Sequence, residues 1–240
     1  MRKLLAAALL TLSTLALAQA ARAPALDAYL AALTAVEQAP APVSLEPLFA
    51  AAGAAQDALM EIQGQGDQAW IETLAEADFV ALKAQLRGLQ LSRGYDVYAQ
   101  PDGKFLLGLA QGHGRPDDIA FFLLYRDLWD ANLLPRYLEV GNNPTPCVRF
   151  DQNVLQPMYA GWRDYAKRHP QAYTGFTRQM LEDLEEAVGL GVCACGNVQS
   201  VERELRGFVK RFPDTPVAPK IRSRLKELKE DPDLRPVRCR

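Results

Sequence analysis

Residues 116–129, PDDIAFFLLYRDLW, predict the central helix of the fold. Proline suits the first turn of a helix, where an N–H would have no partner, and Asp117 and Asp118 place negative charge at the positive end of the helix dipole. The side chains from Ile119 to Trp129 are apolar nearly all round, which is typical of a buried helix. We therefore expect the other elements to pack around this one.

Helical periodicity continues on both sides of this stretch, because apolar residues recur every three or four positions between breaks rich in proline and glycine. The predicted helices cover residues 21–41, 44–62, 67–86, 116–129, 157–168 and 172–188, and a C-terminal pair lies within 198–230. The expected fold class is all-α: one irregular helical domain over residues 21–240, ending in a helical hairpin at 198–230.

Residues 94–114 fit two local structures. Pro101 and Asp102 suit the start of a short helix that closes at Gly112, and we favour this helix because both neighbouring segments are helical. The alternative is a small β-hairpin near 95–110, in which residues 100–103 form the turn between two strands.

The first twenty residues have the three parts of a secretory signal peptide. Arg2 and Lys3 precede an apolar run from Leu4 to Ala18, and the small residues of Ala18-Gln19-Ala20 suit cleavage after Ala20. The run is too short for a typical transmembrane helix, which needs about 20 residues. We expect a mature chain from Ala21 that is periplasmic or secreted and has no transmembrane segment.

The charge of the chain is slightly acidic and unevenly distributed. The signal holds two of the 27 basic residues and none of the 29 acidic ones, so the mature chain has a net charge of −4. This balance argues against a nucleic-acid partner, because phosphate contacts need a surplus of Lys and Arg. Residues 21–82 contain nine acidic residues and one basic residue, whereas residues 201–240 contain 12 basic and seven acidic. The asymmetry is compatible with intramolecular docking or with an acidic partner.

The four cysteines, Cys147, Cys193, Cys195 and Cys239, predict two disulfides, because an exported chain with an even number of cysteines usually pairs them. Cys193 and Cys195 are too close in sequence to bridge each other without strain. We therefore expect one of them to pair with Cys147 and the other with Cys239. A metal-binding or redox role of Cys193 and Cys195 is an alternative.

Residues 134–151 are rich in proline, glycine and asparagine and predict a long irregular loop. Arg136, Glu139 and Arg149 in this loop either line a cleft or form an ion-pair network that holds the loop down, and we favour the network. If the loop lines a cleft, a hydrolase that acts on cell-wall material through Glu139 or His113 is the alternative function.

Two other groups of titratable residues have simpler interpretations. The acidic cluster of Glu182, Asp183, Glu185 and Glu186 is interpreted as a solvated helix face. His113 and His169, the two histidines of the chain, lie at predicted helix ends, where a cation favours the negative end of the dipole. We predict no catalytic residue, metal site or cofactor from these groups.

The C-terminal pair carries a Phe212-Pro213-Asp214-Thr215 turn between two amphipathic helices. Over residues 199–229 it resembles the tetratricopeptide-type helical hairpin of bacterial envelope proteins. A fainter echo aligns residues 167–170 (KRHP) with residues 210–213 (KRFP), 43 positions later, although the residues after each proline do not keep step. The resemblance implies protein–protein binding or scaffolding and no chemistry of its own.

Together these observations favour an exported interaction or scaffold protein over an enzyme. Its partner is expected to be another envelope protein or a wall component.

Intact mass spectrometry of the exported protein tests export and cysteine pairing together. We expect a chain that begins at Ala21, lacks four hydrogens relative to the reduced chain and takes up no alkylating reagent before reduction. An uncut N-terminus would contradict the signal peptide, and an alkylated thiol would contradict the two disulfides.

Overall fold

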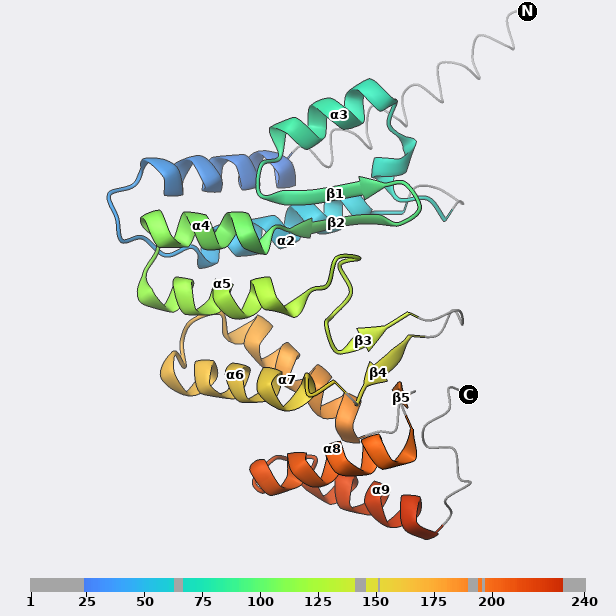
Figure 1. The fold of residues 1–240 in the computed structure, drawn as a ribbon. Helices are drawn as coiled ribbons and strands as arrows, with labels where there is room; N and C mark the ends of the chain where they lie inside the picture. The colour runs from blue at the N-terminus through green and yellow to red at the C-terminus, as the bar shows by residue number, and fades with distance from the viewer. Residues whose placement is uncertain are drawn as a thin grey trace, which may run out of the picture. The chain divides into compact units, whose positions relative to one another are not determined.

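The computed structural model describes residues 24–62, 67–140, 146–150, 152–189, 194–195 and 197–230 (Figure 1). The predicted signal peptide, Cys193 and Cys239 lie outside these residues. The fold is mostly helical with a small β-hairpin, which confirms the predicted fold class. The chain divides into two compact units, Met1–Phe122 and Leu123–Arg240. The predicted single-domain organisation stays a prediction. None of the described helices has the length and apolar character to cross a membrane.

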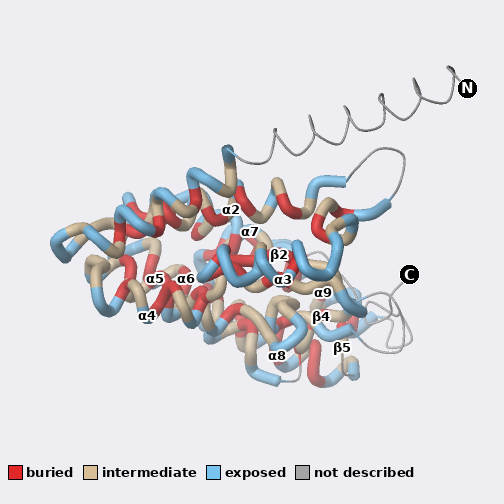
Figure 2. Tube along the Cα trace, turned by 90° about the horizontal axis from the view of Figure 1, so that it is seen from above, coloured by how far each residue is buried: buried red, intermediate tan, exposed pale blue. Residues whose placement is uncertain are grey.

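Unit 1 combines helices with one β-hairpin. Its elements are a helix at 24–38, α2 (Glu46–Met60), a 3-10 helix (Trp70–Thr73), α3 (Glu76–Gln85), β1 (Leu89–Arg93), β2 (Val97–Pro101), α4 (Gly103–His113) and the first part of α5 (Pro116–Leu128). Its core is made by the inner faces of these elements, whose buried positions recur along the trace in Figure 2. The buried side chains include Tyr29, Leu33, Leu48, Leu59, Ile71, Leu91, Leu106 and Phe121.

Residues 94–114 form part of a hairpin and a complete helix, so the two predicted alternatives are combined. The helix begins next to Asp102, as predicted, because the Asp102 carboxylate accepts the backbone N–H groups of Lys104 (2.9 Å) and Phe105 (3.2 Å). The expected hairpin turn at 100–103 is wrong, because those residues already start α4. The turn instead lies at 94–96, between β1 and β2.

The predicted helix over 67–86 is divided into the 3-10 helix and α3, which corrects the prediction. Leu74 and Ala75 have extended backbone between the two. The Leu74 carbonyl accepts a hydrogen bond from the guanidinium of Arg93, which also pairs with Glu76 and lies 4.4 Å from the centre of the Phe79 ring. This contact from β1 holds the break and fixes α3 against the hairpin.

Asp118 joins the starts of α2 and α5 inside unit 1. Its side chain is fully buried, and its carboxylate accepts the backbone N–H groups of Leu45 (3.0 Å) and Arg115 (2.8 Å). The Arg115 guanidinium donates to Ser44 (2.9 Å) and Asp117 (2.9 Å). One carboxylate therefore satisfies amide groups at two helix N-termini that no intrahelical carbonyl can reach.

The helix predicted to be central, α5, begins at Pro116 as expected but is not buried all round. Phe121, Phe122 and Tyr125 are buried, whereas Leu123 is 40% exposed. The boundary between the two units falls within this helix.

Unit 2 contains a small sheet followed by two helical hairpins (Figure 1). Its elements after α5 are β3 (Leu138–Glu139), β4 (Cys147–Arg149), α6 (Leu155–Arg168), α7 (Thr174–Gly189), β5 (Ala194–Cys195), α8 (Val198–Arg211) and α9 (Ala218–Glu230). The strand order is β3-β4-β5, with the first pair antiparallel and the second parallel. The expectation that 134–151 is wholly irregular is therefore wrong, because β3 and β4 lie within it. A disulfide joins Cys147 to Cys195 across the parallel pair.

Replacing Asp118 by Asn should destabilise unit 1 by about 1–3 kcal/mol, because one of the two buried N–H groups would then face an NH₂ donor instead of an oxygen. Urea unfolding followed by circular dichroism measures this. The matched control is Asp57→Asn on the exposed face of α2, which should change the free energy of unfolding by less than about 0.5 kcal/mol. Equal effects of the two substitutions would contradict the role given to Asp118.

Candidate functional site

The helical hairpins α6–α7 and α8–α9 repeat one structural unit. Helices α6 and α8 are each 14 residues long, and both ends of α8 lie 43 positions after those of α6. A proline follows the C-cap of each helix, Pro170 after α6 and Pro213 after α8. Helices α7 and α9 begin 44 positions apart, which is one residue more than the offset between α6 and α8. This shift explains why the sequence echo loses step after the proline.

The first helices of the two hairpins also end in the same way. The C-cap of α6 is His169, with φ −128° and ψ 61°, and the C-cap of α8 is Phe212, with φ −126° and ψ 66°. The N–H of each cap donates to the carbonyl four residues earlier, Tyr165 or Phe208, at 2.8 Å. The same local hydrogen bonds therefore close both first helices.

Several buried positions correspond between the two copies, although buried Tyr159 matches Glu202, which is not buried. At an offset of 43, Trp162 matches Leu205 and Tyr165 matches Phe208. At an offset of 44, Thr177, Met180 and Leu184 match Ile221, Arg224 and Leu228, and every one of these residues is buried. The repeat therefore includes part of the packing faces as well as the bounds of α6 and α8.

Tyr159 on α6 holds the two hairpins together. Its ring lies 4.9 Å from the ring centres of both Phe208 and Phe212. Its hydroxyl donates to Glu185 on α7 and lies 2.9 Å from the hydroxyl of Thr215, which also donates to Glu185 at 3.2 Å. Burial, together with the hydrogen bond to Glu185, raises the pKa of Tyr159 to about 12. The aromatic and hydroxyl residues of the 212–215 turn thus both contact Tyr159.

The acidic cluster on α7 is only partly solvated, which corrects its interpretation as a solvated face. Glu182 is exposed and lies 4.0 Å from Arg178, but Glu185 bonds to Tyr159 and Thr215. Buried Tyr137 has its pKa raised to about 12 by burial and by the negative charges of Asp183 and Glu186. The charges of Asp183 and Glu186 therefore disfavour ionisation of Tyr137, the residue before β3.

Two arginines fasten the second hairpin to the rest of unit 2. Arg163 on α6 makes two hydrogen bonds to the Asp214 carboxylate, at 2.6 and 3.2 Å, and lowers the pKa of Asp214. Arg224 on α9 is buried, donates to the Val188 carbonyl at the end of α7 (3.1 Å) and lies 5.1 Å from the centre of the Phe150 ring. Burial lowers the pKa of Arg224 to about 10. The sequence gives one indication that Arg224 is buried, because Arg224 lies between Ile221 and Leu228 on the apolar face of its helix.

Glu204 on α8 lies against the start of α6. It is buried, its carboxylate faces the backbone and side chain of Gln156 in the first turn of α6, and its Oε1 atom has no hydrogen-bond partner among the described residues. Gly207 leaves room for this contact, because a Cβ there would lie 2.8 Å from the Gln156 side-chain nitrogen. Burial outweighs the hydrogen bonds and the nearby charge of Arg203, so the pKa of Glu204 is raised.

The residues predicted as a cleft or an ion-pair network do not assemble into a larger group among the described residues. Glu139 and Arg149 form an ion pair at 3.4 Å between β3 and β4, as the network interpretation expects, while Arg136 is exposed. His113 ends α4 in unit 1, and His169 ends α6 in unit 2 with its ring 5.0 Å from that of Tyr165.

For the cysteine site, the structure shows one of the predicted pairings. Cys195 is bonded to Cys147, so its sulfur is not a thiolate that can bind a metal. Cys193 lies outside the described residues. The described part of the chain contains no group of three or more His, Cys, Asp or Glu side chains arranged to hold a metal ion.

Comparisons with protein-family models, curated proteins and solved structures found no match to this chain.

Replacing Glu204 by Gln should raise the melting temperature at pH 7 by a few degrees. A carboxyl whose pKa is raised in the folded state binds protons more tightly there, so its contribution to stability falls as the pH rises above about 4, the ordinary pKa of Glu. The amide keeps an oxygen to accept the Gln156 N–H. The gain should vanish near pH 4, where wild type is protonated. The control Glu202→Gln, which removes the partner of Arg206 on the same helix, should give no gain, and a gain independent of pH would contradict the assignment.

Proposed function

We propose that this protein is an exported, non-enzymatic interaction protein of the bacterial envelope or the extracellular space, and that it binds a protein partner through the helical hairpins of unit 2. The observation that carries the proposal is the repeated hairpin: α6 and α8 have equal lengths and matching C-caps, and several buried positions of α6–α7 recur in α8–α9. Tandem helical hairpins present extended surfaces, and binding other proteins is their usual role.

The resemblance to tetratricopeptide-type hairpins supports the same proposal through one local feature. In the 212–215 turn, Phe212 packs on Tyr159, Thr215 bonds to Glu185 and Asp214 binds Arg163. Each of these side chains therefore holds one hairpin against the next. The period of 43 residues is longer than the 34 residues or so of a tetratricopeptide repeat, so the resemblance lies in the turn and not in the spacing.

The outer face of α9 is polar. The exposed positions of α9 include Lys220, Arg222, Lys226 and Lys229, together with Glu227 and Glu230. The signal peptide expected from the sequence and the disulfide between Cys147 and Cys195 support export, since disulfides persist in oxidising compartments.

Site-specific photocrosslinking in the producing cell tests this proposal. A crosslinking amino acid at exposed Gln199 on α8 should give one discrete adduct with a protein that mass spectrometry identifies and that retrieves this chain in a reciprocal purification. The same amino acid at exposed Ala84 on α3 is the matched control and should give none. Adducts from Ala84 alone, or none from exposed positions on α6, α8 and α9, would contradict binding through unit 2.

A further inference from the structure

The repeat preserves exposed cations as well as buried side chains. Residues 163–170 read RDYAKRHP and residues 206–213 read RGFVKRFP, so Arg, Lys, Arg and Pro recur at the same places. The aromatic residue of each copy is explained by packing, because Tyr165 and Phe208 are fully buried. The pairs Lys167 with Arg168 and Lys210 with Arg211 are exposed, so packing does not account for their recurrence.

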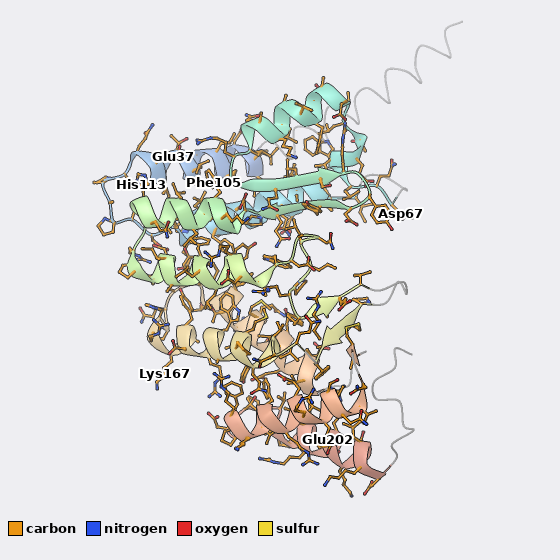
Figure 3. All side chains as sticks on the ribbon, in the orientation of Figure 1. Glu37, Asp67, Phe105, His113, Lys167 and Glu202 are labelled. Carbon is orange, nitrogen blue, oxygen red and sulfur yellow. A yellow bond between two sulfur atoms is a disulfide. The ribbon has the colours of Figure 1, made fainter. Side chains whose placement is uncertain are left out.

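The two cationic ends lie near each other because α8 ends beside the middle of α6. The Phe212 ring packs on Tyr159, and Asp214 binds Arg163, so the end of α8 lies level with residues 159–163. From Arg163 to Arg168, α6 extends about 8 Å further, at about 1.5 Å per residue. Both helices end on the same side of unit 2 (Figure 1), and Lys167 lies at the free end of α6 (Figure 3).

Three of the cations at these helix ends have no carboxylate partner among the described residues. Arg163 is paired with Asp214, and Arg168 with Asp164. Lys167, Lys210 and Arg211 have no carboxylate within 4 Å among the described residues, and Arg211 lies over the Phe212 ring at 5.3 Å. The two helix C-termini together carry about one negative charge, which offsets only part of the three positive charges. Two adjacent ends sum to a local charge that attracts an anion.

The surroundings favour an acidic protein segment over a lipid surface. Helices that bind membranes combine basic residues with exposed apolar anchors. In the described part of unit 2, the large exposed apolar side chains are Leu123 and Val140, and neither lies on α6 or α8. Packed helices lie about 8–10 Å apart, so with the axial offset of about 8 Å the two ends are about 12 Å apart. An extended peptide rises about 3.3 Å per residue, so carboxylates three or four positions apart match this separation.

We propose that Lys167, Lys210 and Arg211 form one binding site for an extended acidic segment of a protein partner, with carboxylates three or four residues apart. The inference rests on the proposed function, because it names the chemistry of the partner that unit 2 binds.

A peptide titration of the full mature chain tests the site. The probe is a fluorescein-labelled 12-residue peptide of alternating Glu and Gly, followed by anisotropy at low salt. The variant Lys167→Gln/Lys210→Gln/Arg211→Gln should bind it about tenfold or more weaker than wild type. The control Arg222→Gln/Lys226→Gln/Lys229→Gln makes the same charge change on the exposed face of α9 and should weaken binding less than about threefold. The peptide with Gln in place of Glu should not bind.

Equal losses in the two triple variants would overturn the site, because they would show attraction by total charge alone. Tighter binding to vesicles that contain anionic phospholipid than to the peptide would overturn it in favour of a lipid surface. The photocrosslinking experiment separates this inference from the proposed function. If the Lys167/Lys210/Arg211 variant still forms the Gln199 adduct, the site is wrong while the proposed function stands. If wild type forms no adduct but binds the peptide at these residues, the proposed function fails while the site stands.

Discussion

The hydrogen bonds of Tyr159 are the interaction on which unit 2 depends. Its hydroxyl meets Glu185, 26 positions later on α7, and Thr215, 56 positions later in the α8–α9 turn. Its ring packs against Phe208 and Phe212. A buried network of this kind stabilises a structure only when every member has its partner, so one side chain sets the position of both hairpins.

The two copies of the repeat distinguish the residues that packing constrains from the residues that it does not. Buried positions tolerate different chemistry between the two copies, since Met180 corresponds to Arg224 and Trp162 to Leu205. The difference at Arg224 is matched locally, because Arg224 reaches the Val188 carbonyl and the Phe150 ring. The exposed cations recur in both copies although no packing contact requires them. This contrast is why we assign binding to the exposed helix ends and stability to the buried faces.

Local sequence signals predicted the helices better than the points at which they break or turn. Most helices were found because their periodicity, prolines and caps act within a few residues, as Asp102 does at the start of α4. The break at Leu74 was missed because the group that holds it, the Arg93 guanidinium, is 19 positions away. The hairpin turn was misplaced because one stretch satisfies the rules for both a turn and a helix start.

The sequence by itself determined the helical fold class, the starts of α4 and α5, the choice of cysteines that can pair and the uneven distribution of charge. These properties depend on composition and on neighbours within one or two helical turns. The tertiary structure decided that Cys195 is the partner of Cys147, that Glu185 bonds inside an acidic cluster and that Arg224 is buried. Their hydrogen-bonded or covalently bonded partners lie between 26 and 48 positions away along the chain, and only folding brings such groups together.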